Sequence, residues 1–202
     1  MKKFICTVLV SVMLIVITAV VSHAAIIHTV ERGDSLWKLA VKYQVGLSEI
    51  KSANPTIKNY DLIYPGQQIN IPTVSSSTAA FEAEVVRLVN QRRAEHGLKP
   101  LTQDWQLSRV ARYKSQDMKD LGYFSHTSPT YGSPFQMMKS FGISYRTAGE
   151  NIAKGYASPE TVVNAWMNSP GHRANILNST YTHIGVGYVS SGNYWTQMFI
   201  SK

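Results

Sequence analysis

A short Ser/Thr-rich stretch divides the chain into two unequal parts and so limits what each part can fold into. It runs Thr73-Val74-Ser75-Ser76-Ser77-Thr78 and directly follows Pro72, a composition typical of a linker. Upstream, residues 26–72 can form only a compact module, whereas residues 81–202 are enough for an independent hydrophobic core. The sequence therefore predicts two domains joined by a linker at residues 73–80.

Residues 1–24 have the pattern of a secretory signal peptide. Lys2 and Lys3 precede an almost wholly apolar run from Phe4 to Val21, and Ser22-His23-Ala24 provides small residues where a signal peptidase cuts. We expect cleavage at the end of this segment; an uncleaved membrane anchor is the alternative, because the run is nearly long enough to span a bilayer. The single cysteine, Cys6, lies in this segment, so we expect no disulfide and no cysteine metal site in the mature chain.

The net positive charge of the chain limits the kinds of partner that we expect it to bind. Removing Lys2 and Lys3 from the formal net charge of +8 leaves +6, which favours attraction to anionic wall polymers or to a membrane surface. The basic residues are scattered and are not interleaved with aromatic residues. We therefore do not expect nucleic acid as a partner.

The N-terminal unit has a β-α-α-β pattern. Residues 28–31 alternate as a strand, and Asp34 or Ser35 is placed to cap a helix whose apolar residues repeat at helical spacing. A second helix near residues 47–53 ends at Asn54-Pro55, and residues 68–71 return as a strand.

This pattern resembles the LysM module over residues 26–72. The matching residues are Thr29-Val30, Gly33-Asp34-Ser35-Leu36, Ala40, Tyr43, Asn54-Pro55, Leu62-Ile63-Tyr64-Pro65-Gly66-Gln67 and Ile71-Pro72. The resemblance implies binding of N-acetylglucosamine glycans such as peptidoglycan, in a groove between the loop after the first strand and the loop after the second helix. By position, the groove would use Gly33, Asp34, Ser35 and Leu36 facing Asn54, Pro55, Leu62 and Ile63. Alternatively, Asp34 and Ser35 only cap a helix, and Leu62 and Ile63 only fill the core.

The C-terminal unit alternates helical and strand patterns. Helices are predicted at residues 81–96, 104–118, 135–141 and 160–167, the last two opened by Ser133-Pro134 and Ser158-Pro159. Residues 184–188 and 194–200 alternate on either side of Ser190-Ser191-Gly192-Asn193, which predicts a β-hairpin. Helices around a small, mainly antiparallel sheet make the chain α+β.

The C-terminal unit resembles a bacterial CAP domain, also called SCP or PR-1-like. The resemblance rests on Phe124-Ser125-His126, Gly149-Glu150-Asn151-Ile152, Trp166, Ser169-Pro170-Gly171-His172-Arg173, Asn175-Ile176-Leu177, Ile184-Gly185-Val186-Gly187 and Tyr194-Trp195-Thr196-Gln197. It implies an α-β-α sandwich with a central cleft, so the whole chain would pair a small βααβ module with a larger sandwich.

Many CAP proteins carry two histidines and two glutamates in the cleft, sometimes with a divalent metal. The resemblance assigns His126, Glu150 and His183 to this set, places Ser169 at the second glutamate position, and leaves His172 as a partial replacement. His126, Glu150 and His183 would suit Zn²⁺ or another divalent cation in kind. The alternative is a metal-free polar network in which Glu150 orients a histidine. Small and turn-forming neighbours predict that these side chains lie on turns.

Three functions remain open on these residues. The favoured one is a secreted, wall-associated protein, in the vegetative wall or in a spore wall or coat, whose LysM module binds peptidoglycan and whose CAP cleft binds an unknown ligand without catalysis. The second is a wall or peptide hydrolase, with His126, Glu150, His172 and His183 as candidates to activate water or a serine such as Ser125 or Ser169. A glycosidase needs two carboxylates across the bond, and the cleft motifs provide only Glu150. The third function is lipid binding.

Overall fold

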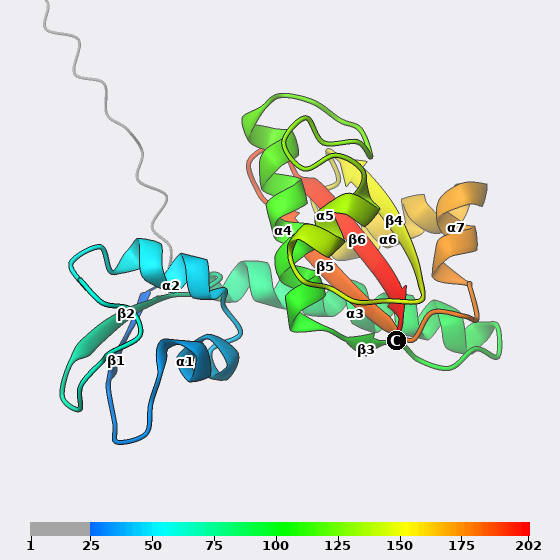
Figure 1. Cartoon of the computed structure of the whole chain (residues 1–202). Coiled ribbons are helices and arrows are strands. Elements are labelled where there is room, and N and C mark those ends of the chain that lie inside the picture. Colours follow the sequence, from blue (N-terminus) through cyan, green and yellow to red (C-terminus); the bar gives the residue numbers. More distant parts are fainter. Residues whose placement is uncertain (1–24) are drawn as a thin grey trace, which may run out of the picture.

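The structure is a computed structural model that describes residues 25–202, so the predicted signal peptide lies outside the described residues. It contains a small N-terminal unit and a larger C-terminal unit, joined at the start of a long helix (Figure 1). Within residues 25–202, no helix has the length and apolar character needed to cross a membrane.

The N-terminal unit is the predicted βααβ module. Strand β1 (Ala25–Thr29) pairs antiparallel with β2 (Gln68–Pro72), and between them lie α1 (Leu36–Lys42) and α2 (Leu47–Ala53). Both helices and both strands surround a small apolar core that includes Leu39, Ile50 and Ile69, each wholly buried. Pro72 is the last residue of β2, where its missing N–H costs no interior ladder bond.

The connection between the units is shorter than the sequence predicts. Helix α3 (Ser76–Glu95) begins inside the expected linker, so residues 76–80 form its first turns. The side chain of Ser75 caps this helix by accepting a hydrogen bond from the Thr78 N–H at 3.2 Å. Serines that look like linker composition therefore act partly as a helix start, and only residues 73–75 connect β2 to α3.

A four-stranded sheet forms the centre of the C-terminal unit. Its strands are β3 (Thr102–Gln103), β4 (Thr147–Lys154), β5 (His183–Val189) and β6 (Tyr194–Ser201), in the spatial order β3-β5-β6-β4. Pairs β5–β6 and β4–β6 are antiparallel, and the short β3 pairs parallel with β5. Strands β5 and β6 form the predicted hairpin, and β4 is a strand where the sequence suggested a turn.

Helices cover both faces of this sheet and make the expected α-β-α sandwich (Figure 1). Helices α4 (Trp105–Asp120) and α5 (Pro134–Ser140) pack on one face, and α3 and α6 (Pro159–Asn168) pack on the other. The short α7 (Pro170–Ile176) follows α6 and contacts β4 at the sheet edge. Ser133 and Ser158 cap α5 and α6 as predicted, each followed by Pro at the first helical position.

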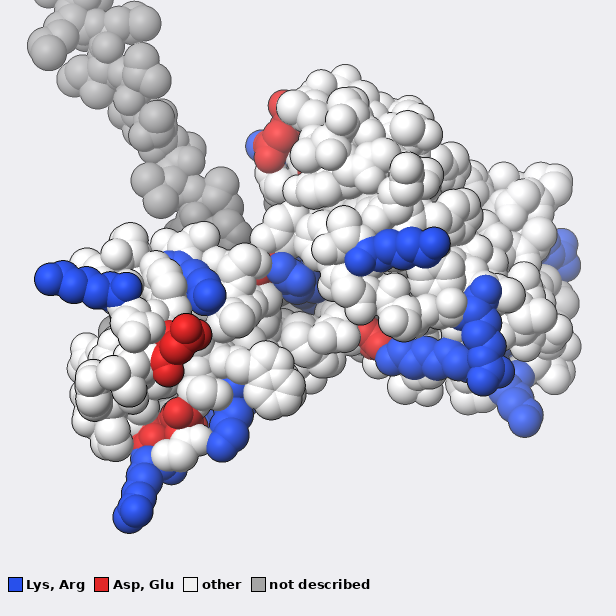
Figure 2. All heavy atoms as spheres, viewed as in Figure 1, with Lys and Arg blue, Asp and Glu red and all other residues white. Residues whose placement is uncertain are grey.

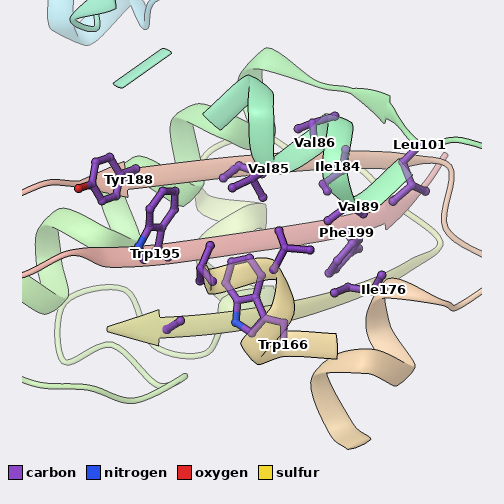
Figure 3. Packing of buried hydrophobic residues seen from close by; sticks show 14 of the residues in the cluster. Val85, Val86, Val89, Leu101, Trp166, Ile176, Ile184, Tyr188, Trp195 and Phe199 are labelled. Atoms are coloured by element: carbon purple, nitrogen blue, oxygen red, sulfur yellow. The ribbon is translucent and has the colours of Figure 1, made fainter. Parts of the chain in front are cut away.

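The core beneath α3 and α6 contains several large aromatic side chains. Trp166 from α6 and Trp195 and Phe199 from β6 are almost wholly buried among aliphatic residues of α3 and β5 (Figure 3). Tyr188 stacks on Trp195 with ring centroids 4.0 Å apart. These tryptophans are therefore core residues.

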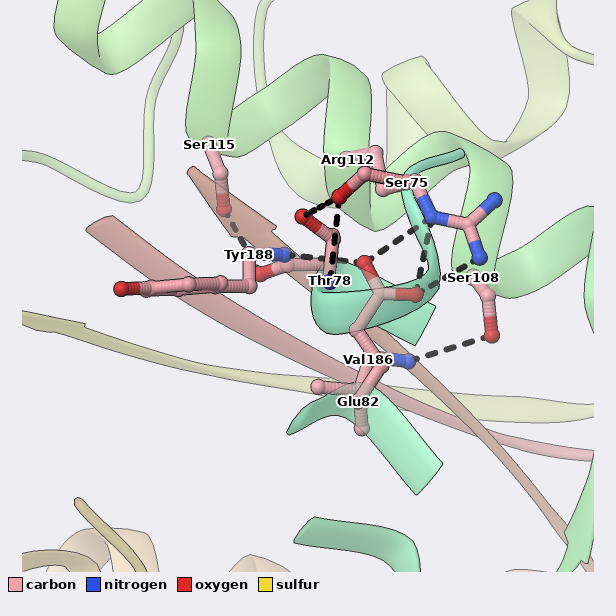
Figure 4. A network of polar contacts seen from close by, with 9 residues as sticks. Ser75, Thr78, Glu82, Ser108, Arg112, Ser115, Val186 and Tyr188 are labelled. Atoms are coloured by element: carbon pink, nitrogen blue, oxygen red, sulfur yellow. Dashed lines mark hydrogen bonds and ion pairs between the residues drawn. The ribbon is translucent and has the colours of Figure 1, made fainter. Parts of the chain in front are cut away.

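A buried ion pair joins α3 to α4 and β5. Glu82 of α3 is 1% exposed, and its carboxylate accepts hydrogen bonds from Arg112 of α4 at 2.6–2.9 Å and from the Tyr188 N–H at 3.1 Å (Figure 4). Burial raises the pKa of Glu82, and the hydrogen bonds from Arg112 oppose that shift. The contact therefore fixes helix α3 against helix α4 and strand β5.

Candidate functional site in the C-terminal unit

The candidate site is built around a contact between His126 and Glu150. The Nδ1 atom of His126 lies 2.7 Å from Oε1 of Glu150, and the two side chains are 53% and 2% exposed. Glu150 comes from β4, whereas His126 comes from the loop after α4. A buried carboxylate therefore holds an imidazole that faces solvent, the arrangement expected when Glu150 orients a histidine.

Polar side chains from α4 support the loop that carries His126. Lys114 is wholly buried, and its Nζ donates to the His126 carbonyl at 3.0 Å and to the Tyr123 hydroxyl at 3.1 Å. Asp117 accepts hydrogen bonds from the hydroxyls of Tyr123, Ser128 and Thr130. The loop is thus fixed at both ends of residues 123–130 by two side chains of one helix.

Helix α7 is attached to β4 by two asparagines. Asn151 donates from Nδ2 to the His172 carbonyl at 3.1 Å, and Asn175 donates to Oδ1 of Asn151 at 2.8 Å and to the Glu150 carbonyl at 3.2 Å. These contacts place His172 beside the strand that carries Glu150. Asn151 and Asn175 therefore hold α7 against β4 beside the His126–Glu150 contact.

Burial and neighbouring charge shift the ionisation of the cleft residues. Burial raises the pKa of Glu150, while the hydrogen bond to His126 and the charge of Lys114 act in the opposite direction. The pKa of His172 is lowered by burial and, to a smaller extent, by the charge of His126. Burial also lowers the pKa of Lys114, against the charges of Glu150 and Asp117. The charge of His126 therefore acts on the pKa of both Glu150 and His172.

His183 does not lie beside His126 and Glu150. It begins β5, and its Nδ1 is 2.7 Å from Oγ1 of Thr182. Strand β6 separates β5 from β4, and the register aligns Glu150 with Met198 and Gly185, so His183 is two strands away and two residues out of step. The structure brings His172, and not His183, to His126 and Glu150.

The proposed metal ligands do not converge. His126 and Glu150 are in contact, but His183 is not with them, and no group of three or more His, Cys, Asp or Glu side chains within residues 25–202 is placed to hold a metal ion. The residues expected to bind Zn²⁺ or another divalent cation therefore do not fit that ligand set in this arrangement.

The hydroxyls considered as nucleophiles are also not paired with a base. Ser125 Oγ accepts from the Thr127 N–H at 3.2 Å, and Ser169 lies at the junction of α6 and α7 without a side-chain cap bond. Within the described residues, neither hydroxyl is hydrogen-bonded to an imidazole. Glu150 lies on strand β4 and not on a turn, so the expectation that it sits on a turn is wrong.

In the N-terminal unit, three of the eight expected groove residues make structural contacts. Asp34 Oδ2 lies 2.9 Å from His28 Nε2 and accepts from the Glu31 N–H at 2.8 Å, and Ser35 caps α1. Asn54 is buried and bonded to Asn70 and Ile50. The members of the expected groove are thus divided: Leu36 and Asn54 are buried, Asp34, Ser35 and Ile63 are partly buried, and Gly33, Pro55 and Leu62 are exposed.

Comparisons with known proteins agree with this architecture. Residues 86–200 match the family model for CAP, the cysteine-rich secretory protein family, and residues 28–72 match the LysM domain model. The two units thus define a LysM domain followed by a CAP domain. The chain belongs to the CAP family.

Individual relatives match parts of the chain. The chain is 68% identical over 127 residues to the uncharacterized protein YkwD of Bacillus subtilis (strain 168), covering 63% of this chain and 49% of that protein. It is 47% identical over 49 residues to the spore coat assembly protein ExsA of Bacillus cereus, covering 24% of this chain and 8% of that protein. The chain therefore spans about half the length of YkwD and a small part of ExsA.

A crystal structure of an extracellular protein containing a SCP domain from Bacillus anthracis str. Ames has the same fold. It is 34% identical, with a TM-score of 0.60, and the match covers 68% of this chain and 47% of that chain. This likeness confirms the α-β-α sandwich predicted for the C-terminal unit.

Proposed function

We propose that this is an exported, wall-associated protein whose LysM domain binds N-acetylglucosamine glycans of peptidoglycan and whose CAP cleft binds a ligand without catalysis. The observation that carries the first part is the LysM fold with Gly33, Pro55 and Leu62 exposed on the two loops of the expected groove. Loop backbone groups can bond an acetamide, and an exposed Leu62 side chain can receive its methyl group.

The absence of a second carboxylate supports a binding role for the CAP cleft. Glu150 is paired with His126, and Ser169 stands where the resemblance places a second glutamate. Oε2 of Glu150 is buried and has no hydrogen-bond partner among the described residues. One buried carboxylate with an imidazole can hold a polar ligand, but it does not provide the pair of carboxylates that a glycosidase uses.

The setting at the wall is part of the proposal. Similarity of 49 residues of the chain to the spore coat assembly protein ExsA supports a spore wall or coat as one location, beside the vegetative wall. On the face that Figure 2 shows, Lys and Arg side chains are spread over both domains and do not form a single patch.

Sedimentation with insoluble peptidoglycan tests the glycan part. We expect the protein to pellet with peptidoglycan and Leu62→Ala to weaken pelleting, since Leu62 is 50% exposed and is not needed for the core. Ile27→Ala is the matched control, because Ile27 is 61% exposed on β1, outside the groove. Equal pelleting of Leu62→Ala and the wild type would contradict the groove assignment.

Incubation with muropeptides followed by mass spectrometry tests the binding role of the CAP cleft. We expect the masses of the muropeptides to stay unchanged over time while complexes are detected. Product release that Glu150→Gln abolishes would overturn the non-catalytic assignment and favour the hydrolase.

A further inference from the structure

The LysM and CAP domains meet through a specific ion pair. Arg109 of α4 donates from Nε to Oε1 of Glu49 at 2.5 Å and from Nη2 to Oε2 at 2.9 Å, and Nη2 also reaches the Ser48 hydroxyl at 3.0 Å. Glu49 and Ser48 lie in the first turn of α2 in the LysM domain. A bidentate guanidinium–carboxylate contact fixes both distance and orientation between its partners.

This contact is sheltered on the CAP side by aromatic rings. The guanidinium of Arg109 lies 5.1 Å from the ring centroid of Phe141 and 5.4 Å from that of Tyr113. Arg109 and Glu49 side chains are only 20% and 21% exposed. Partial burial and stacking make such a pair stronger and less sensitive to salt than an exposed surface pair.

The LysM domain is shaped to receive this arginine. Gly46, the residue before α2, is buried, and a Cβ atom there would lie 2.4 Å from Cζ of Arg109 and 1.8 Å from Oε2 of Glu49. The φ angle of Gly46 is −70°, which any residue adopts, so its backbone conformation does not require glycine. Glycine is needed at this position because a side chain would occupy the space of the Arg109–Glu49 ion pair.

Little chain is available for the domains to separate. Only residues 73–75 lie between the end of β2 and the start of α3, and α3 continues directly into the sandwich (Figure 1). In Figure 2, basic and acidic side chains meet at the junction of the two domains. The domains are therefore joined both by a short connection and by a charged contact.

The Arg109–Glu49 ion pair lies apart from both candidate sites along the helices that carry it. On α2, Glu49 lies five residues before Asn54, about 7 Å along the helix axis from the groove end. On α4, Arg109 lies eight residues before Asp117, about 12 Å along the axis from the polar side chains behind His126. The contact occupies neither the exposed groove loops nor the His126–Glu150 cleft.

We infer that Arg109 docks the LysM domain onto α4 through Glu49 and Ser48, so that the glycan groove and the CAP cleft are carried by one rigid body. A ligand that touches both sites would meet them at a preset spacing, which reduces the entropy lost on binding compared with a flexible tether. The inference goes beyond the proposed function, because docking exists with or without a bound glycan.

Backbone ¹⁵N relaxation of the ligand-free protein tests the docking. In the wild type, LysM and CAP amides should report one rotational correlation time. In Arg109→Glu and in Glu49→Arg, the LysM value should fall below the CAP value, because like charges then face each other. The double variant Glu49→Arg/Arg109→Glu should restore a common value. The control is Arg87→Glu, which breaks an exposed pair with Glu84 on α3.

Two outcomes would overturn the inference. One is separate correlation times for the two domains in the wild type. The other is a common correlation time that persists in both single variants while circular dichroism shows that they are folded. Peptidoglycan pelleting, measured in parallel, separates this result from the proposed function: undocked variants that still pellet retain the glycan site, and a docked protein that does not pellet lacks it.

Discussion

Lys114 donates a 3.0 Å hydrogen bond from its Nζ atom to the main-chain carbonyl of His126, although Lys114 is wholly buried in α4. The backbone of His126 is therefore held from the interior while its imidazole contacts Glu150 at 2.7 Å. A buried ammonium is costly unless its hydrogens are bonded. This pairing makes Lys114 a positioning residue for the exposed imidazole.

Replacing Lys114 by methionine should loosen this loop. Lys114→Met keeps the length of the side chain but removes the hydrogen bonds to His126 and Tyr123, so we expect a loss of about 1–3 kcal/mol in the free energy of unfolding. Urea denaturation measures the loss, and hydrogen exchange should be faster for amides at residues 126–131. Lys119→Met, at a half-exposed position on the same helix, is the control. Unchanged exchange in Lys114→Met would show that the loop does not depend on this contact.

The second prediction concerns the contribution of the buried Glu82–Arg112 ion pair to the free energy of unfolding. Arg112→Met leaves the 1% exposed carboxylate of Glu82 without its charged partner, and we expect a cost of about 3–5 kcal/mol in unfolding free energy at neutral pH. Because burial already raises the pKa of Glu82, protonation should reduce this cost as the pH falls. The double variant Glu82→Met/Arg112→Met should recover most of the stability. If the double variant is as unstable as Arg112→Met, packing and not charge accounts for the loss.

Glu150 should impose a measurable pH dependence on stability. Burial raises its pKa in the folded chain above the unfolded value, so the folded chain binds more protons between the two values. The free energy of unfolding contributed by Glu150 therefore falls as the pH rises through this window and is constant above it. Below the unfolded pKa the carboxyl is protonated in both states, and this contribution is not lost.

Glu150→Gln removes that titration. Its unfolding free energy relative to the wild type should rise from acid toward neutral pH, by about 1.4 kcal/mol for each unit by which the pKa of Glu150 is raised. Chemical denaturation at a series of pH values measures the difference. Glu160→Gln, on the exposed start of α6, is the matched control. A difference that does not change with pH would mean that burial does not dominate the ionisation of Glu150.

Local signals in the sequence predicted most of the fold. The Ser133-Pro134 and Ser158-Pro159 pairs placed two helix starts, and the alternation around Gly192 placed the β5–β6 hairpin. These features depend on neighbours in the chain, so a single sequence can reveal them. The Ser/Thr-rich stretch was misleading because serine serves both as a linker residue and as a helix cap.

The site was harder to predict because it depends on sheet order. The resemblance grouped His126, Glu150 and His183, with His172 as a partial replacement, whereas the structure brings only His126 and Glu150 into direct contact. Spacing along the chain does not reveal that β6 lies between β4 and β5 and so separates His183 from Glu150. His172 reaches the cleft through α7, which Asn151 and Asn175 hold against β4. The role of Lys114 was not predicted, because a single lysine in an amphipathic helix is typical of a solvent-exposed position. Only the structure shows that this lysine is buried.

The close approach of α4 to β5 gives the last prediction. A Cβ atom on Gly187 would lie 2.1 Å from the backbone nitrogen of Arg112 and 2.2 Å from the carbonyl carbon of Ala111. Those atoms belong to a helix backbone and cannot move aside as a flexible side chain can. Gly187→Ala should therefore push α4 from the sheet and lower the free energy of unfolding by about 1–3 kcal/mol or more.

Gly171 provides the matched control, because a Cβ atom there meets nothing within 4 Å and the residue lies in helix α7. Gly171→Ala should leave stability unchanged or raise it by up to about 1 kcal/mol, since alanine favours a helix over glycine. Thermal and urea unfolding of both variants measure the contrast. Equal stability of Gly187→Ala and the wild type would show that α4 can shift on β5 at no cost, and the Lys114–His126 contact on the same helix would then be expected to shift as well.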